Sequence, residues 1–324
     1  MRRREFIALL GGAAVTWPLA ARAQQGERMR RIGVLAQDLQ PGLLETLREE
    51  LRNLGYVEGK SLSIELRNAA GRSDRLPALV DDLLRLKVAV IVAVNTSAAQ
   101  VAKKATTTVP IVIMRVADPV KSGLVPNLAR PGGNVTGLSF MPDELGAKGL
   151  EMLRDTLPGI SHVAALYQGD NPGAVIVVSE TERRCAQLGI QFLNLPVHEP
   201  RDFAAAFETA ARAQTQALFV MDDGAITNNR AQILDLAARH ALPVVSIYRD
   251  FAAAGGLIAY GPSLPTLYRR AAYYVDRILK GEPARELPVE QPTKFDLVVN
   301  LKTAKTLGLT IPPSVLVRAD EVLE

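Results

Sequence analysis

Short apolar runs alternate with segments of helical periodicity along the chain after its N-terminal segment. Leu44, Leu47, Leu51 and Leu54 recur at steps of three and four residues, which is typical of one buried helix face. Residues 88–94 form a continuous apolar run, as expected of a strand that is covered on both faces. Strands that alternate with amphipathic helices indicate βαβ units and parallel sheets.

The alternation falls into two similar series. We expect strands at 32–36, 62–66, 88–94, 110–115, 162–167, 190–195, 217–221, 243–247, 256–260 and 297–300. We expect helices at 44–54, 76–84, 97–105, 143–157, 173–188, 202–213, 227–240, 265–280 and 302–307. Residues 118–142 are rich in proline and glycine and are interpreted as a loop region that ends near a crossing between two domains. The length of 324 residues also favours two domains.

The first residues have the pattern of an export signal. Arg2, Arg3 and Arg4 precede an apolar run at 6–18, and the small-x-small sequence of residues 21–23 follows. The run is too short to span a bilayer, which needs about 20 apolar residues. We therefore expect a signal peptide at 1–23, of the twin-arginine type, and a periplasmic product that does not insert into the membrane after cleavage.

Charge and cysteine content narrow the classes of partner. Removal of residues 1–23 would lower the formal net charge from +4 to +1, and no Lys/Arg run remains. A nearly neutral surface gives no electrostatic footprint for nucleic acid, so we expect no nucleic-acid partner. Cys185 is the only cysteine, which excludes a disulfide within the chain.

Candidate binding residues follow the predicted strands, because ligands of open parallel sheets lie beyond the carboxyl ends of the strands. Asn95, Thr96 and Ser97 follow the run at 88–94. Ser97 and Gln100 have the spacing of a capping box at a helix start, where backbone N–H groups favour an anion. Ser97 therefore either contacts a ligand or only caps its helix.

Further candidates stand at the other predicted strand ends. They are Gln37, Asp118, Gln168, Asn171, Asp222, Asp223 and Tyr248. The adjacent carboxylates of Asp222 and Asp223 suit an ammonium group, although one of them could cap a helix while the other is solvated. Tyr248, Tyr167 and Tyr260 offer rings for stacking, or form the edge of the core with the hydroxyl in water.

The sequence lacks the usual catalytic and cofactor motifs. It contains neither a phosphate-binding loop, nor a dinucleotide fingerprint, nor the zinc-protease and serine-hydrolase signatures. His162 opens a predicted strand, His240 ends a predicted helix and His198 lies in a proline-flanked loop, so none indicates a ligand set or a general base. Cys185 lies on an amphipathic helix without an evident basic partner. We therefore expect no enzyme activity, no cofactor and no metal site.

Four ordered segments together resemble a known family. They are Gly55–Lys60 (GYVEGK), Ala117–Val120 (ADPV), Pro131–Gly137 (PGGNVTG) and Asn300–Ala304 (NLKTA) with Leu307–Pro312 (LGLTIP). In this order they resemble the substrate-binding proteins of ABC transporters that are related to tryptophan- and tyrosine-binding importers. The resemblance runs from about Arg31 to the end of the chain.

The resemblance implies the type I periplasmic binding protein fold: two Rossmann-like α/β lobes, each a parallel sheet flanked by helices, joined by three crossings. It implies lobe 1 at 30–140 plus about 262–290, and lobe 2 at 141–261 plus about 291–324. It also implies a monomer without catalysis that binds an amino acid or related small polar metabolite and delivers it to the permease subunits of an ABC importer. The residues that would line the cleft are Asn95, Thr96, Ser97, Asp118, Asn171 and Asp222.

Two features leave the function partly open. The pairs Asp222–Asp223 and Tyr248–Arg249 depart from the pattern expected of aromatic amino-acid binders, so the ligand is not specified. A ligand-sensing regulatory module with the same fold, but without transport, is the main alternative. An enzyme with Rossmann-like domains is a second one, which the missing motifs disfavour.

Overall fold

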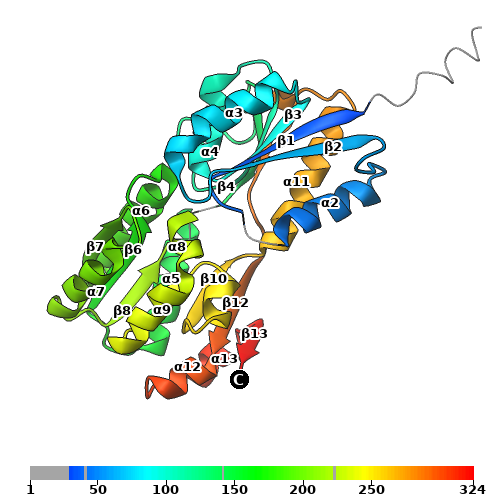
Figure 1. Cartoon of the computed structure of the whole chain (residues 1–324). Coiled ribbons are helices and arrows are strands. Elements are labelled where there is room, and N and C mark those ends of the chain that lie inside the picture. Colours follow the sequence, from blue (N-terminus) through cyan, green and yellow to red (C-terminus); the bar gives the residue numbers. More distant parts are fainter. Residues whose placement is uncertain (1–28, 40–41, 141, 222–223) are drawn as a thin grey trace, which may run out of the picture.

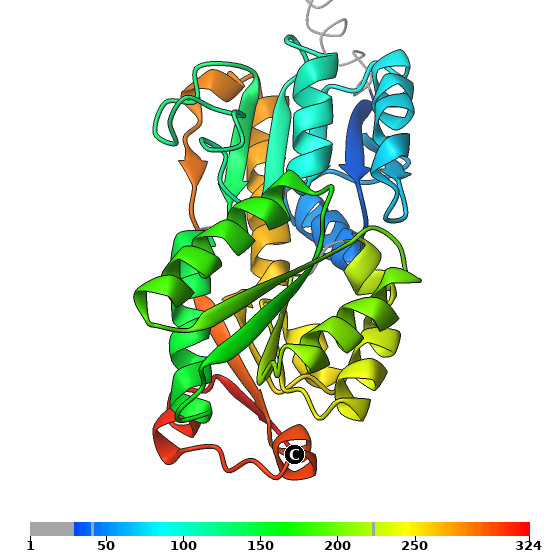
Figure 2. The same cartoon turned by 90° about the vertical axis from the view of Figure 1, so that its left-hand side faces the viewer.

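The computed structural model describes residues 29–39, 42–140, 142–221 and 224–324. Its strands and helices form two α/β lobes that lie one above the other (Figures 1 and 2). Each lobe is built on a twisted sheet of mostly parallel strands with helices on both faces, as the sequence predicts.

Lobe 1 has a six-stranded sheet in the order β11-β5-β4-β3-β1-β2. Its strands are β1 (Arg30–Ala36), β2 (Leu62–Asn68), β3 (Val90–Val94), β4 (Ile111–Val116), β5 (Val135–Ser139) and β11 (Val289–Glu290). Its helices are α2 (Leu43–Asn53), α3 (Leu76–Arg85), α4 (Thr96–Ala105) and α11 (Leu264–Leu279), with short 3₁₀ turns at Ser73–Arg75 and Ala284–Glu286.

Lobe 2 has a seven-stranded sheet in the order β13-β12-β10-β9-β8-β6-β7. Its strands are β6 (His162–Gln168), β7 (Gln191–Val197), β8 (Ala217–Val220), β9 (Val244–Ser246), β10 (Ile258–Pro262), β12 (Phe295–Asn300) and β13 (Glu321–Leu323). Its helices are α5 (Pro142–Thr156), α6 (Pro172–Gln187), α7 (Asp202–Arg212), α8 (Gly224–Asn228), α9 (Arg230–Arg239), α10 (Arg249–Ala253), α12 (Leu301–Thr306) and α13 (Pro313–Leu316). The pair β10–β12 is antiparallel, whereas the other pairs are parallel.

The two sheets repeat one strand order, since β2-β1-β3-β4-β5 corresponds to β7-β6-β8-β9-β10. The chain passes between the sheets three times: after β5, after β10 and after β11. In each lobe the strand order reverses beside the first strand, so the crevice at the carboxyl ends of the central strands is the expected ligand position. These ends of the two sheets face one another across the gap between the lobes (Figure 1).

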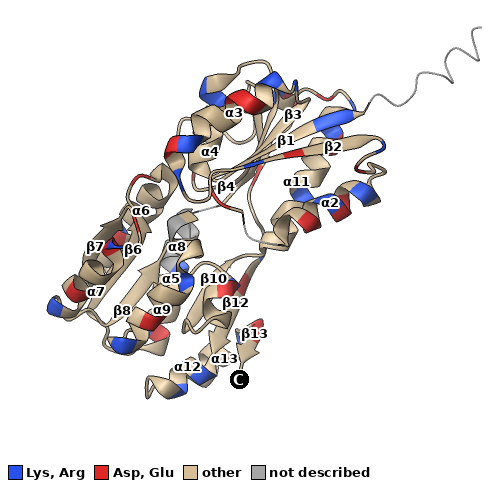
Figure 3. Ribbon diagram, in the orientation of Figure 1, with Lys and Arg blue, Asp and Glu red and all other residues tan. Residues whose placement is uncertain are grey.

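Apolar side chains alternate between the two faces of each sheet and form a core on both. In lobe 1, Val34 and Val92 pack towards α2 and α11, whereas Leu35 and Ile91 pack towards α3 and α4. In lobe 2, one core lies under α5 and α6 and another under α7 and α9. Acidic and basic residues are interspersed along α2 and α3 on the outside (Figure 3).

Two sequence predictions of local structure are wrong, and several short elements were not predicted. Residues 118–142, interpreted as loop, contain β5, whose Gly137 has φ 127° and lies so close to β4 that a Cβ atom would stand 2.3 Å from the Ile113 carbonyl oxygen. A glycine within a strand marks this kind of close backbone approach. The single helix predicted at 227–240 is two helices, α8 and α9, separated at Asn229. The short elements α10, β11, α13 and β13 were not predicted.

Candidate ligand-binding site

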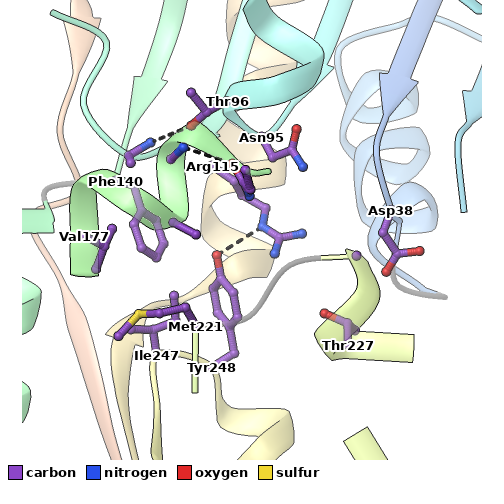
Figure 4. Close-up of a pocket in the computed structure, with 15 residues that line it drawn as sticks. Asp38, Asn95, Thr96, Arg115, Phe140, Val177, Met221, Thr227, Ile247 and Tyr248 are labelled. Atoms are coloured by element: carbon purple, nitrogen blue, oxygen red, sulfur yellow. Dashed lines mark hydrogen bonds between the residues drawn. The ribbon is translucent and has the colours of Figure 1, made fainter. Parts of the chain in front are cut away.

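A pocket lies between the lobes, and both lobes line it (Figure 4). Its cavity volume is about 50 Å³. Lobe 1 contributes Asp38, Asn95, Thr96, Arg115, Ala117 and Phe140. Lobe 2 contributes Asn171, Gly173, Ala174, Val177, Met221, Gly224, Thr227, Ile247 and Tyr248. Nearly all of them follow a strand or begin a helix, as a site at the carboxyl edge of parallel sheets requires.

The first turns of α4 and α6 meet at this pocket. Asn95 caps α4, because its side-chain oxygen accepts a hydrogen bond of 3.0 Å from the Ala98 N–H. Asn171 caps α6 in the same way, with 2.9 Å to the Gly173 N–H. Helix N-termini carry partial positive charge, so two of them favour a negative charge nearby.

The predicted capping role of Ser97 is wrong. Asn95 has φ 82° and precedes the helix, so its amide reaches the first free N–H groups, whereas Ser97 is already the second helical residue. The Ser97 side chain is buried, 7% exposed, and its hydroxyl has no hydrogen-bond partner among the described residues. It does not line the pocket.

Arg115 comes from an irregular part of β4. The pairing of β4 with β5 shifts between Ile113 and Val116, and Arg115 has φ 57° in the left-handed region. Its Nε donates a hydrogen bond of 3.1 Å to the Tyr248 hydroxyl, and its guanidinium carbon lies 4.8 Å from the centre of that ring. Because Tyr248 belongs to lobe 2, Arg115 links the two lobes through the pocket.

Asp38 follows β1 on another side of the pocket. Its carboxylate accepts a hydrogen bond of 3.3 Å from the Asn228 amide of lobe 2. Burial raises the pKa of Asp38 above its usual range, while the hydrogen bond from Asn228 and the positive charge of Arg115 act in the opposite direction. The pocket therefore holds groups of both signs.

The rest of the pocket wall is apolar. Phe140, Val177, Met221 and Ile247 gather on the side away from Asp38 (Figure 4). The Phe140 and Tyr248 rings are tilted against each other with their centres 5.8 Å apart. The pocket thus combines an apolar end with a charged end, which suits a small molecule that has an apolar body and an ionic head.

Four of the predicted site residues line this pocket: Asn95, Thr96, Asn171 and Tyr248. Gln37, Ser97, Asp118 and Gln168 do not line it, and Asp222 and Asp223 lie outside the described residues. The carboxylate of Asp118 instead accepts hydrogen bonds of 2.9 Å from the N–H groups of Val120 and Lys121, and so holds its own turn.

Gln37 and Gln168 occupy equivalent positions, at the ends of β1 and β6, and bind each other across the lobes. The Gln37 amide nitrogen lies 3.3 Å from the Gln168 side-chain oxygen and 2.8 Å from the Ser73 hydroxyl. The Asn95 amide donates to the Gln37 oxygen over 2.6 Å. Gln37 and Gln168 are 0% and 2% exposed, so this amide chain joins the pocket residue Asn95 to the lobe interface.

Asp38 and Arg115 were missed from the sequence. Asp38 directly follows the predicted strand end that drew attention to Gln37, so the same rule extended by one residue would include it. The sequence places Arg115 at the end of the predicted strand 110–115, where a charged residue in an otherwise buried strand indicates a functional position. Tyr260 stacks on Phe295 instead of lining the pocket, with ring centres 5.7 Å apart.

Cys185 and the histidines lie away from the pocket. Burial, with a smaller effect of Glu182, raises the pKa of the Cys185 thiol to about 12. Within the described ranges, His, Cys, Asp and Glu side chains nowhere gather in a group of three that could hold a metal ion.

A sequence profile for the family described as "ABC transporter substrate binding protein" matches residues 35–323. The chain is also similar to the tyrosine-binding protein of Clostridioides difficile (strain R20291). The two are 24% identical over 260 residues, which is 80% of this chain and 74% of the relative.

Solved structures share the fold over 91% of this chain. A conserved domain protein from Vibrio cholerae has 26% identity and a TM-score of 0.86 over 100% of its length. The ABC domain of Streptococcus pneumonia in complex with L-Trp has 24% identity and a TM-score of 0.85, also over 100% of its length. The ligand-free, open structure of a substrate binding protein with adhesive properties from Clostridium difficile has 23% identity and a TM-score of 0.66 over 99% of its length.

Proposed function

Because this chain belongs to the family of ABC transporter substrate binding proteins, we propose that it captures an amino acid or related small polar metabolite between its lobes for an ABC importer. The observation that carries the proposal is the pocket at the carboxyl ends of the central strands, whose walls come from both lobes. A ligand in this pocket contacts both lobes at once, so it stabilises the closed arrangement over the open one.

The pocket and the relatives together support this class of ligand. An ionic head fits the end with Asp38 and Arg115, and an apolar body fits the end with Phe140 and Met221. One relative is a tyrosine-binding protein, and one similar structure is a complex with L-Trp. Amino acids and amino-acid-like metabolites have this division between an ionic head and a body, which makes them the first compounds to test.

Contacts outside the pocket support lobe closure as the working motion. Lys121 of lobe 1 pairs with Glu180 of lobe 2 at 2.6 Å, and Gln37 bonds to Gln168. At nearly equal identity, the chain overlays better on the complex with L-Trp than on the ligand-free, open structure, with TM-scores of 0.85 and 0.66. We take residues 30–140 with 262–290, and 141–261 with 291–324, as the two units that move.

The cellular context is part of the same proposal. The pattern of residues 1–23 supports export by a twin-arginine signal, and a periplasmic binding protein would act as a monomer that presents its closed form to the permease subunits. Among the described residues, every helix falls short of the length or hydropathy that a membrane span needs.

A thermal-shift screen of the purified chain without residues 1–23 tests the proposal. The screen uses the twenty amino acids, their aromatic acid analogues and small polyols, each at millimolar concentration. A true ligand at 100 times its dissociation constant stabilises the protein by about 2.7 kcal/mol. Asn95→Ala in the pocket should abolish the shift, and Asn194→Ala on the exposed edge strand β7 should retain it. The proposal is wrong if no compound shifts the melting temperature or if both variants respond like the parent.

A further inference from the structure

Arg115 lies in the pocket wall, where the register between β4 and β5 is irregular. The strand register shifts there, and the residue adopts φ 57°, a conformation that non-glycine residues rarely use. A bulge turns the side chain of a strand residue in a new direction, and such strain persists where the surrounding structure holds it, often at functional sites. Without the bulge, regular alternation along β4 would decide where this side chain points.

The side chain leads into the pocket and across to the other lobe. Figure 4 shows the guanidinium in the middle of the pocket, between Phe140 and Asp38, with Tyr248 beside it. The Nε atom donates to the Tyr248 hydroxyl over 3.1 Å, and the guanidinium carbon lies 4.8 Å from the ring centre. Tyr248 is only 4% exposed, so this contact holds the guanidinium against a fixed ring. Because Tyr248 belongs to the other lobe, this contact orients the arginine when the lobes close.

We propose that Arg115 is the specificity-determining residue of this pocket: it binds a carboxylate of the ligand, and its contact with Tyr248 makes that recognition depend on lobe closure. The planar guanidinium offers paired N–H donors that match the two oxygens of a carboxylate. The inference rests on the proposed function and narrows it to ligands that carry a carboxylate beside an apolar body.

The neighbouring groups agree with an anionic head at this place. The N-terminal ends of α4 and α6 meet beside Arg115 at the contact of Thr96 with Gly173, and both ends add positive potential. Asp38 is held by Asn228 on another side of the pocket, which leaves a place for a cationic group of the same ligand. The apolar body then lies against Phe140, Val177 and Met221.

The competing interpretation gives Arg115 a purely structural role, as a bridge to Tyr248. The two interpretations differ in one measurable quantity: the ratio of affinities for a carboxylate and for the matching carboxamide. Removal of a structural bridge lowers the affinity for both compounds equally. Removal of a carboxylate-binding residue lowers the affinity for the acid far more than the affinity for the amide.

The experiment combines ligand and protein changes in one cycle by isothermal calorimetry on the chain without residues 1–23. The probes are L-tryptophan, L-tyrosine and L-leucine, each compared with its carboxamide. Arg115→Met removes the charge at similar length, Arg115→Lys keeps the charge without the planar fork, and Arg212→Met changes an exposed arginine on α7 as the control. Tyr248→Phe removes the acceptor of the Arg115 hydrogen bond but keeps the ring.

The parent and Arg212→Met should prefer the acid over the amide by about 10- to 100-fold, the effect expected of a charge-assisted hydrogen-bond pair. Arg115→Met should reduce this preference to about threefold or less, and Arg115→Lys should reduce it by about fivefold. Tyr248→Phe should weaken binding of the acid more than binding of the amide. If Arg115→Met fails to fold, the ratio of acid to amide affinity in Arg115→Lys decides between the two interpretations.

The outcomes separate the two proposals. If the parent binds acid and amide equally, or if the ratio is the same in Arg115→Lys and the parent, Arg115 does not read a carboxylate, and the proposed function stands. If the parent binds none of these probes nor any compound of the thermal-shift screen, the proposed function itself fails, and this inference fails with it.

Discussion

Gly173 at the start of α6 lies so close to Thr96 at the start of α4 that a Cβ atom on residue 173 would stand 2.3 Å from the Thr96 Oγ1. The two residues belong to different lobes, so the missing side chain allows the lobes to meet. A second such contact joins Gly224 of lobe 2 to Gly71 of lobe 1, where an added Cβ atom would lie 2.7 Å from the Gly71 Cα. Both contacts border the pocket.

Gly173→Ala should therefore hinder closure without preventing folding. We expect ligand affinity to fall at least about tenfold, because the clash, about 1.4 kcal/mol or more, exists only in the closed arrangement. Titration calorimetry, together with small-angle scattering with and without ligand, measures both quantities. Gly133→Ala is the matched control, since nothing lies within 4 Å of its added Cβ atom. Equal affinity and equal compaction in Gly173→Ala and the parent would show that the lobes do not meet here.

Gln168→Met should weaken ligand binding although Gln168 does not line the pocket. The change removes the cross-lobe bond to Gln37 and keeps the side-chain volume. A net loss of about 0.5–1.5 kcal/mol in the closed state corresponds to about 2- to 10-fold in affinity. Gln191→Met, at an exposed position on β7, should leave the affinity unchanged. The prediction fails if the two variants bind alike.

Glu180→Gln should reduce the salt dependence of ligand binding. Glu180 pairs with Lys121 across the lobes at 2.6 Å, and hydrogen bonds from Lys121 and then Arg183 hold the pKa of its carboxyl below the usual range. The pair is partly exposed, so the variant should lose less than about 1 kcal/mol, or about fivefold in affinity. Affinity measured between 0.05 and about 1 M NaCl should change less in the variant than in the parent, because salt screens the pair. If the salt dependence is unaltered in the variant, other charges cause the salt dependence of ligand binding.

Asp38→Asn should stabilise the ligand-free closed form at pH 7. Burial raises the pKa of Asp38, so its ionised form opposes folding at neutral pH. This cost is largest above the raised folded pKa, declines as the pH falls through it, and is absent below the unfolded value of 3.8. Urea unfolding of parent and variant at several pH values measures the difference in the free energy of unfolding. The difference should shrink towards zero as the medium becomes acidic; a difference that grows instead would mean that Asp38 is stabilised as an anion.

Cys185 should be unreactive in the folded protein. Its thiol is buried, and burial raises its pKa to about 12, so almost no thiolate exists at pH 8. Labelling with a thiol reagent should proceed in urea, and under native conditions only at the rate of unfolding. Rapid labelling of the native protein would contradict the packing of α6 against its core.

The sequence already specified much of this fold. Periodicity alone located the helix with Leu44, Leu47 and Leu51 and the buried strand at 90–94. A helix buried on one face and a strand buried on both faces each have a characteristic spacing of apolar residues. It did not reveal β5, because a short strand with Gly137 at its centre has the composition of a loop. Only the contact with the backbone at Ile113 explains that glycine.

The candidate site was predicted in part for the same reason. Strand ends are visible in a sequence, and the rule that ligands lie beyond them led to Asn95, Thr96 and Asn171. Which strand-end side chains point into the pocket depends on backbone geometry and on the other lobe. The left-handed turn at Arg115 directs it to Tyr248, and the symmetric position of Gln37 and Gln168 makes them bond to each other. Such pairings join residues more than a hundred positions apart, so only the tertiary structure decided them.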